Sequence, residues 1–324
     1  MPFAACADSG NPGTSPVNPQ ALLILIAHHP PAEHIQRLQS CLTDLSAEIS
    51  YALVINDHIA GEPVEDLLPQ AAMAIVQSAN PGYGRAFNEL WKRWCQTYGI
   101  PPLVAVLNTD LSWEPGCFEA LIDWLKQHPT ITAATPQLRF PDGQQQFLCK
   151  RNPTLLALLS RRFIPKRVKP SFLHRYDRWY TMGDQDYDQV FASSYLSGCC
   201  LWMRGWAVQA VQGFDPRFFL YFEDADITRR LAELGPTVNF PWCTVTHHWG
   251  RGSYRNWKLT LVNLHSAWLY FRKWGFSCGE RGSNPRRSIS TGRWRPKMRN
   301  HLDLQPAHAS TLVRPWRSQG IQGV

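Results

Sequence analysis

Apolar runs the length of a β-strand alternate with helix-like spacing in the first third of the chain. Three continuous apolar runs, at residues 22–27, 51–55 and 103–107, are typical of strands buried on both faces. A first helix is indicated after the first run by apolar positions at Ile35, Leu38, Cys41, Leu42 and Leu45. A second helix is expected at residues 87–98. This alternation predicts an α/β domain with a mixed, mainly parallel sheet flanked by helices.

Polar side chains follow these runs where each strand is expected to end. The second run leads into Asn56-Asp57, and the third into Asn108-Thr109-Asp110. A glycine-containing turn at residues 80–84 follows a further short strand expected at 74–77. Ligands of parallel sheets bind outside the carboxyl ends of the strands, so the three polar ends together predict a pocket. Each end taken alone is also what a simple turn would look like, because Asn and Asp favour turns.

The second half of the chain is less regular. A buried strand is predicted at residues 195–203, another strand at 244–248 ahead of a glycine-rich loop at 250–253, and an aromatic amphipathic helix at 259–271. Residues 150–178 carry nine Lys or Arg and one acid among Leu, Phe, Trp and Tyr. That composition fits a solvated basic face, or a surface that meets an anionic or lipid-linked acceptor.

Three acids, Glu223, Asp224 and Asp226, directly follow an aromatic run at residues 218–222. Carboxylates are costly to bury without partners, so a cluster delivered by an apolar segment suggests a site for a metal, a sugar or a proton. The alternative is a helix that runs through Ile227 and Leu231, with Asp224 as its cap and the other acids in its first turn. The pattern alone leaves both interpretations open.

The net charge of +8 comes mostly from one end of the chain. Residues 279–324 hold nine Lys or Arg and two acids, which leaves a net charge of about +1 for the rest. A nearly neutral body gives no reason to expect a nucleic-acid partner. We expect residues 1–18 to be a disordered leader, residues 19–278 to be the folded domain, and residues 279–324 to be a basic tail that is disordered or non-native.

Cysteine usage and hydropathy suggest an intracellular chain. The nine cysteines form no CxxC pairs, which predicts reduced and mostly buried thiols instead of disulfides or a zinc site. No apolar run reaches the roughly 18 residues of a membrane span, and the leader has no basic segment of a signal peptide. We therefore expect a cytoplasmic protein, and membrane contact at residues 150–178 or 259–271 is a hypothesis.

The order of these pieces resembles glycosyltransferase family 2, and more narrowly its bacterial rhamnosyltransferase-like branch. The resemblance covers residues 20–275 and rests on NPGYGRAFN, LNTDLSWEPG, YLSGCCLWMR, the later histidine loop and, most specifically, GFDPRFFLYFEDADITRR. It implies a GT-A fold, in which a nucleotide-binding α/β half merges with an acceptor-binding half. It also implies an inverting, metal-dependent enzyme of the hexosyltransferase type that moves a sugar, rhamnose in this branch, from a nucleotide diphosphate donor to a glycan or lipid-linked acceptor in surface polysaccharide synthesis.

The resemblance also assigns roles to individual residues. Asp224 matches the general base, with Glu223 orienting the acceptor or serving as the alternative base, and Asp226 capping the next helix. The aromatic run would then form an apolar wall and a strand beside them. Asp110 and His247 match the ligands of a divalent cation, Mg²⁺ or Mn²⁺, which neutralises a departing diphosphate. The residues matching the donor-binding set are Asn56, Asp57, Asn80, Gly82, Asn88, Asn108 and Asp110.

Two other classes of function compete with a glycosyltransferase. A nucleotidyltransferase can share the α/β layer, but it would more typically carry a glycine-rich, lysine-containing phosphate loop where this chain reads His28-His29-Pro30-Pro31. A non-catalytic protein that binds carbohydrate or nucleotide-sugar on the same fold would be indifferent to Asp224→Asn. The oligomeric state is not predicted.

Overall fold

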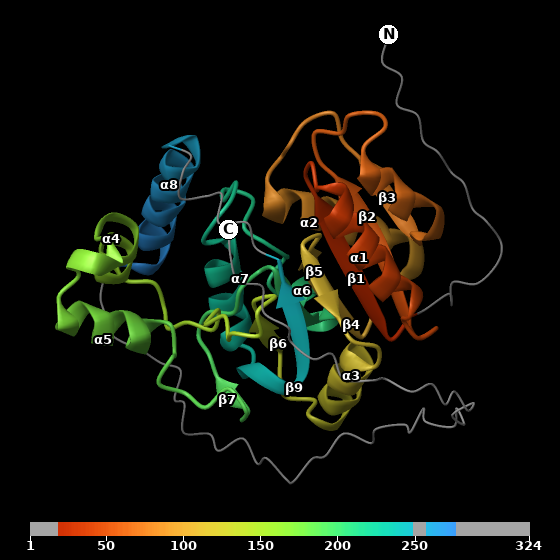
Figure 1. The fold of residues 1–324 in the computed structure, drawn as a ribbon. Helices are drawn as coiled ribbons and strands as arrows, with labels where there is room; N and C mark the ends of the chain where they lie inside the picture. Colours follow the sequence, from red (N-terminus) through yellow and green to blue (C-terminus); the bar gives the residue numbers. More distant parts are fainter. Residues whose placement is uncertain (1–18, 249–256, 277–324) are drawn as a thin grey trace, which may run out of the picture. The chain divides into compact units, whose positions relative to one another are not determined.

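The computed structural model describes residues 19–248 and 257–276. Its first half is the predicted parallel layer, with strands in the order β3-β2-β1-β4 (Figure 1). Every residue of β1 and β2 is buried, which explains their continuous apolar sequence. The bounds of these strands are β1 Ala21–Ala27, β2 Ile49–Ile55, β3 Met73–Val76 and β4 Leu103–Asn108.

The second half of the sheet adds strands of mixed direction. Strand β8 lies antiparallel to β4 and to β6, β6 is parallel to β9, and β9 is antiparallel to β5 and β7. The predicted mixed, mainly parallel sheet flanked by helices is confirmed. The bounds are β5 Leu111–Trp113, β6 Ala133–Arg139, β7 Phe191–Ala192, β8 Cys200–Arg204 and β9 Thr237–His247.

Helices fall into two groups. One group connects the strands of the sheet: α1 Ala32–Thr43, η1 Pro63–Gln70, α2 Tyr83–Tyr98, α3 Cys117–Gln127, α6 Gly205–Ala210 and α7 Glu223–Ala232. The other group lies together beside α7 (Figure 1): α4 Leu155–Phe163, η2 Lys166–Val168, α5 Ser171–Tyr180 and α8 Trp257–Trp274. Among the described residues, no helix combines the length and the apolar character needed to cross a membrane.

A small apolar cluster joins the segment before α7 to α8. Phe218 and Ala225 are fully buried there against Ala267, Tyr270 and Phe271 of α8. The larger core lies between the sheet and helices such as α2 and contains the alternating side chains of β1, β2 and β4. The small cluster therefore fixes the segment at the start of α7 from the side opposite the sheet.

Two sequence expectations about this region are wrong. The strand expected at 195–203 starts only at Cys200, because earlier backbone groups bond to side chains: Thr228 accepts from the Leu196 amide, and Asp224 from the Gly198 amide. The aromatic run at 218–222 is a turn and not a strand, since Tyr221 and Phe222 have positive φ of 72° and 65°. The run still supplies the expected apolar wall, with Phe218 as its buried member.

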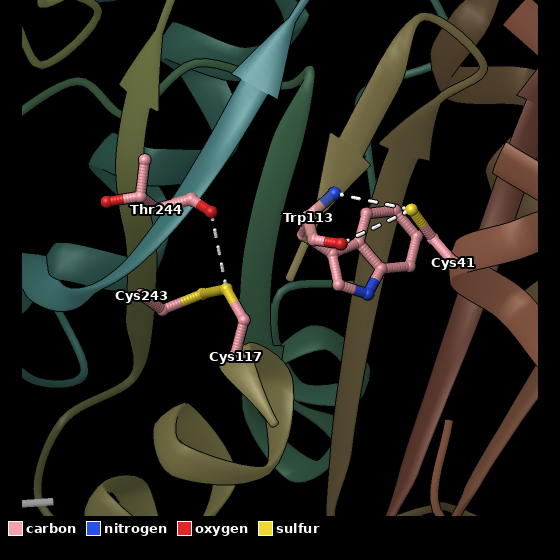
Figure 2. The surroundings of a disulfide bond; sticks show 5 residues. All are labelled: Cys41, Trp113, Cys117, Cys243 and Thr244. Carbon is pink, nitrogen blue, oxygen red and sulfur yellow. Dashed lines mark hydrogen bonds between the residues drawn. A yellow bond between two sulfur atoms is a disulfide. The ribbon is translucent and has the colours of Figure 1, made fainter. Parts of the chain in front are cut away.

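A disulfide joins Cys117, at the start of α3, to Cys243 in β9 (Figure 2). The expectation that the cysteines are reduced is therefore wrong for this pair. The two residues are 126 positions apart, and only the packing of α3 on β9 brings them together, so no local spacing reveals the bond. Cys41, Cys95, Cys149, Cys199 and Cys200 are free thiols.

Three expectations concern residues outside the described ranges. These are the disordered leader at 1–18, the glycine-rich loop at 250–253 and the basic tail at 279–324. They stay predictions, as does the boundary of the domain at 278.

Candidate active site

A pocket of about 330 Å³ opens at the carboxyl ends of the parallel strands. The first half of the chain supplies most of its wall, and Phe219 and Leu220 from the segment before α7 supply the rest. The sequence-predicted residues that line it are Asn56, Asn80, Gly82, Asn108 and Asp110. The parallel strands thus bring five of the proposed donor-binding residues to one place.

The turn that starts α2 is shaped by side chain and glycine together. The Asn80 carboxamide oxygen accepts a hydrogen bond from the Gly82 amide at 2.9 Å. Gly82 has φ of +94°, and a Cβ on it would lie 2.3 Å from the carbonyl oxygen of Phe219. The next amide, that of Tyr83, donates to the same carbonyl at 3.0 Å. A glycine is therefore required for the two walls of the pocket to meet.

His247, at the end of β9, faces Asp110, with 3.2 Å between His247 Nε2 and Asp110 Oδ2. Gln146 binds His247 at two points. Its Nε2 donates to the His247 backbone carbonyl at 3.0 Å. The Gln146 Oε1 must then accept, so His247 Nδ1 donates to it at 2.8 Å. Gln146 therefore aims Nε2 at the carboxylate.

The donor set at Asp110 and His247 fits a divalent cation. The Asp110 Oδ1 atom is buried and has no hydrogen-bond partner among the described residues, which is costly for a carboxylate oxygen. Burial works to raise the pKa of Asp110, but its hydrogen bond with His247 and the charge of His247 outweigh burial and lower it. An ionised carboxylate beside an imidazole nitrogen either pairs with a protonated ring or shares a cation with a neutral one.

Glu223 and Asp224 form the first turn of α7 but lie in different surroundings. Asp224 accepts from the Gly198 amide at 3.0 Å and from the Ala225 amide at 2.9 Å. Glu223 is buried, and its Oε2 has no hydrogen-bond partner within the described ranges. Burial, aided by the charge of Asp224, raises the pKa of Glu223 well above its usual value. The pair therefore favours a neutral Glu223 beside an Asp224 that is held by amides.

Tyr83 links the pocket to Asp224. Its ring lines the pocket, and its hydroxyl donates to the carbonyl of Gly198 at 2.7 Å, the residue whose amide binds Asp224. A Cβ on Gly198 would lie 3.2 Å from the Asp224 Cβ, so this approach is tight. The general-base candidate thus lies one residue away from the pocket wall.

Lys150 and Tyr195 extend this region and were missed by sequence reasoning. They form a β-bridge, and Lys150 Nζ lies 4.2 Å from the centre of the Tyr195 ring. Burial lowers the pKa of Lys150, while the negative charge of Asp224 opposes that change. Burial and the same charge raise the pKa of Tyr195 well above its usual value. Lys150 had appeared only as one member of a basic segment, and no short motif marks it.

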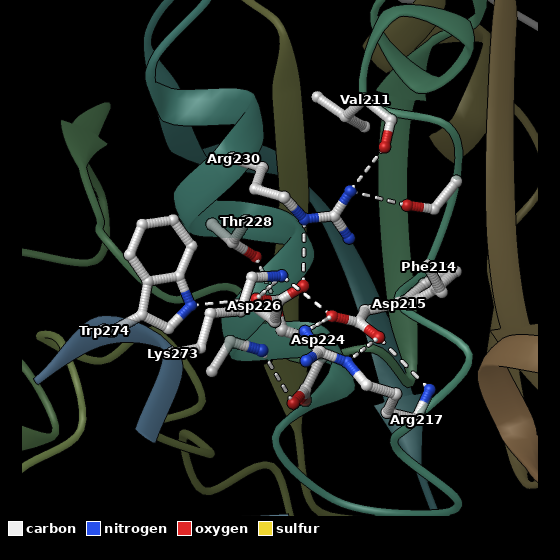
Figure 3. Close-up of polar contacts among 12 residues, drawn as sticks. Val211, Phe214, Asp215, Arg217, Asp224, Asp226, Thr228, Arg230, Lys273 and Trp274 are labelled. Atoms are coloured by element: carbon white, nitrogen blue, oxygen red, sulfur yellow. Dashed lines mark hydrogen bonds and ion pairs between the residues drawn. The ribbon is translucent and has the colours of Figure 1, made fainter. Parts of the chain in front are cut away.

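Asp226 does not cap α7, so that expectation is wrong. Its side chain is fully buried, and it accepts from Arg230 Nε at 2.9 Å and from the indole of Trp274 at 2.8 Å (Figure 3). Lys273 Nζ lies 2.7 Å from Asp226 Oδ1. Asp226 is therefore the anchor between α7 and α8, and Phe222 occupies the position before the helix.

Two residues of the proposed donor-binding set are not among the pocket's lining residues. Asn88 binds the backbone of Phe214 with both ends of its carboxamide, at 2.7 and 2.8 Å, so its polar atoms are already used.

Asp57 lies beside His28 and His29, with its Oδ2 3.8 and 3.7 Å from their Nε2 atoms. These three exposed residues could themselves hold a metal ion, and the two histidines line the pocket. The sequence around His28, His29 and Asp57 matches no metal-binding motif.

A comparison with known sequences finds a relative that matches most of the chain. Over 266 residues, the chain is 29% identical to N-acetylglucosaminyl-diphospho-decaprenol L-rhamnosyltransferase of Mycobacterium tuberculosis, in both strain CDC 1551 / Oshkosh and strain ATCC 25618 / H37Rv. The match covers 77% of this chain and 83% of that enzyme. No family model matches the chain.

Solved structures show the same fold. GalNAc-T7, solved with UDP, GalNAc and Mn²⁺, aligns with a TM-score of 0.52 and 11% identity over 71% of this chain. A mannosyltransferase from Pyrobaculum calidifontis, solved with GDP-Man and Mn²⁺, aligns with a TM-score of 0.51 and 13% identity over 79% of this chain. The chain spans 44% and 64% of those two proteins.

The chain has the GT-A fold of these structures, and the proteins that it resembles in sequence and in fold are glycosyltransferases. Within that class it is similar to rhamnosyltransferases, which confirms the resemblance found in the sequence.

Proposed function

We propose that this protein transfers a sugar, rhamnose as in its relatives, from a nucleoside diphosphate donor to a lipid-linked diphosphate glycan. A deoxythymidine diphosphate-rhamnose donor is the one implied by the resemblance. The proposed acceptor class follows the name of the relatives, whose product is built on N-acetylglucosaminyl-diphospho-decaprenol. The reaction serves synthesis of a bacterial surface polysaccharide at the inner face of the plasma membrane.

The observation that carries the proposal is the pair of carboxylates on either side of the pocket wall. Asp110 offers a buried oxygen with no hydrogen-bond partner among described residues, and His247 lies beside it. Asp224 lies behind Tyr83 and Gly198, on the side of the chain's second half. A leaving diphosphate and an attacking hydroxyl need these two kinds of group on opposite sides of the reacting carbon.

In this proposal Asp110 and His247 would hold Mg²⁺ or Mn²⁺, which would supply positive charge to the diphosphate of the donor. Asn56, Asn80 and Gly82 shape the part of the pocket that takes the nucleoside. Asp224 accepts the proton of the acceptor hydroxyl as its oxygen bonds to the anomeric carbon. The bond from that carbon to the diphosphate oxygen breaks, and its electron pair leaves with the diphosphate. A single displacement of this kind inverts the configuration of the carbon.

Nucleotide release from a panel of nucleotide sugars tests the proposal, with a short-chain lipid-diphospho-N-acetylglucosamine as acceptor and with or without Mg²⁺ or Mn²⁺. We expect release from one donor, dependent on metal and acceptor. Asp110→Asn should lower turnover about 1000-fold and remove the response to metal. Asp224→Asn should lower turnover about 100- to 10,000-fold with donor affinity unchanged.

Asp142→Asn is the matched control, because Asp142 is exposed in a loop outside the pocket. It should leave both turnover and metal response unchanged. Turnover that survives Asp224→Asn would exclude Asp224 as the base. Donor binding without transfer to any acceptor would instead support a non-catalytic binding protein.

A further inference from the structure

Helix α8 presents a row of large apolar side chains to solvent. Trp257, Leu261, Leu264 and Trp268 are 68%, 56%, 37% and 50% exposed. Their spacing of four, three and four residues places them along one face of the helix. The adjoining face is also apolar and packs Ala267, Tyr270 and Phe271 into the protein. Helix α8 therefore has one apolar face more than the described protein covers.

Helix α4 also exposes its large apolar side chains to solvent. It buries the small residues Ala157 and Ser160, while Leu155, Leu159 and Phe163 are 40%, 51% and 52% exposed. Those three follow one another at intervals of four residues, so they also form one row. A helix on a water-facing surface normally directs its large apolar side chains into the protein core.

The segment after α4 continues the pattern, and the three helices are connected. Val168, Phe172 and Trp179 of η2 and α5 are 71%, 59% and 41% exposed. Helices α4 and α5 pack together, and Arg162 of α4 donates a hydrogen bond to Thr260 of α8. The three exposed rows are called the docking face below. Several large apolar side chains exposed on helices that pack together mark an interaction site.

The charge of these helices indicates what the docking face meets. Arg161, Arg167, Arg175, Arg178 and Arg272 are all exposed. The acid in α4–α5, Asp177, is engaged by Lys169 and Ser160, and α8 contains no acidic residue. Trp and Leu rows bordered by arginines are the pattern of helices that lie in the interface of an anionic bilayer. A protein partner of the same chain would present these arginines to one another.

We propose that the docking face binds the surface of an anionic lipid bilayer, with α4, α5 and α8 partly immersed in the headgroup region. This places the active site at the membrane, because α8 holds the segment before Asp224: Ser266 donates to the carbonyl of Leu220 at 2.9 Å. The inference extends the proposed function, in which the acceptor is lipid-linked. An acceptor anchored in that bilayer would present its sugar beside Asp224.

Cosedimentation of the full chain with vesicles tests the docking face. The vesicles are phosphatidylcholine alone, or phosphatidylcholine with about one quarter phosphatidylglycerol, at low salt and at about 0.5 M salt. The wild type should bind the anionic vesicles and lose most of this binding at high salt. The double variant Leu159→Gln/Leu264→Gln should bind about 100-fold more weakly, about tenfold for each leucine. Arg167→Gln/Arg175→Gln should lose about 25-fold, about fivefold for each charge.

The control is Ile59→Gln/Val76→Gln, which changes two apolar residues outside the docking face that are at least as exposed as Leu264, at 62% and 50%. It should bind as the wild type does, and all variants should share the wild-type far-ultraviolet circular dichroism. Absence of vesicle binding by the wild type, or binding unaffected by the leucine variant, overturns the proposal. So does light scattering that shows a dimer which the leucine variant dissociates, because a second copy would then cover the face.

The docking face and the proposed function can fail separately. Sugar transfer to a short-chain acceptor is measured without vesicles and should be unchanged in the leucine variant. Vesicle binding by a protein that transfers no sugar supports the docking face and removes the proposed function. Sugar transfer by a protein that never binds vesicles supports the proposed function and removes the docking face.

Discussion

Two regions of this molecule place their side chains by different means. The parallel region, residues 19–110, delivers Asn56 and Asp110 to one pocket because its strands run in the same direction and end at the same edge. The irregular region, residues 140–232, positions Asp224 through hydrogen bonds from backbone amides that have no strand partner there. The first uses repeated backbone geometry, and the second uses individual buried polar groups.

This difference determines what a substitution should do. In the parallel region the backbone ladder stays intact when a pocket side chain is changed, so binding changes more than stability. In the irregular region the hydrogen-bonded polar side chains are themselves the links, so removing the bonds of such a side chain costs stability and the site together.

The largest expected effect breaks the link between α7 and α8. Asp226→Ala removes the acceptor shared by Arg230, Lys273 and Trp274 and leaves two cations without it. We expect a loss of about 3–5 kcal/mol in the free energy of unfolding, measured by denaturant titration. Glu233→Ala, at the exposed end of the same helix, is the control and should cost less than about 0.5 kcal/mol. Equal effects of the two changes would contradict the anchoring role of Asp226.

The next effect tests the junction of the two regions. Gly82→Ala must move the Phe219 carbonyl, 2.3 Å from the new Cβ, and also adopt a φ that alanine disfavours. We expect a loss of about 2–4 kcal/mol in stability and about tenfold weaker donor binding by calorimetry, because Phe219 lines the pocket. Gly61→Ala shares the positive φ but meets no atom within 4 Å. It should cost about 1 kcal/mol with unchanged binding. Weaker donor binding in both variants would count against a pocket-specific effect.

The same division explains what the sequence could predict. The buried strands and their polar ends were readable, since period and composition determine them. Helix α7 was foreseen as one of two alternatives, but Asp224 does not cap it: Phe222 holds the cap position, and Asp224 lies in the first turn with the other two acids. The amphipathic helix at 259–271 was also expected, and it is observed as α8 from Trp257 to Trp274.

What could not be predicted depends on contacts between distant residues. Asn88 matches a family position by sequence, yet its carboxamide is used by Phe214, 126 positions away. Cys117 and Cys243 are just as distant. Lys150 gains its surroundings only when its bridge to Tyr195 forms. No local pattern encodes such pairs, so the sequence alone does not reveal them.

The smallest effect separates the two neighbouring carboxyl groups at the start of α7. Burial raises the pKa of Glu223, so the folded state keeps a proton that the unfolded chain releases above about pH 4.3. Stability therefore falls as pH rises from there toward the folded pKa. Glu223→Gln removes this dependence. We expect its melting temperature to match the wild type near pH 4 and to exceed it by a few degrees near pH 8, measured by calorimetry at both pH values.

Turnover of the same variant shows which carboxyl group takes the proton. A neutral Glu223 cannot accept one, so Glu223→Gln should change kcat less than about fivefold, whereas general-base loss at Asp224 costs about 100-fold or more. Glutamine preserves the shape of the buried acid and its capacity to donate a hydrogen bond. A large loss of kcat together with an unchanged melting profile would make Glu223 the ionised base. The amides that hold Asp224 would then only fix the start of α7, and the irregular region would position its site through burial instead of hydrogen bonding.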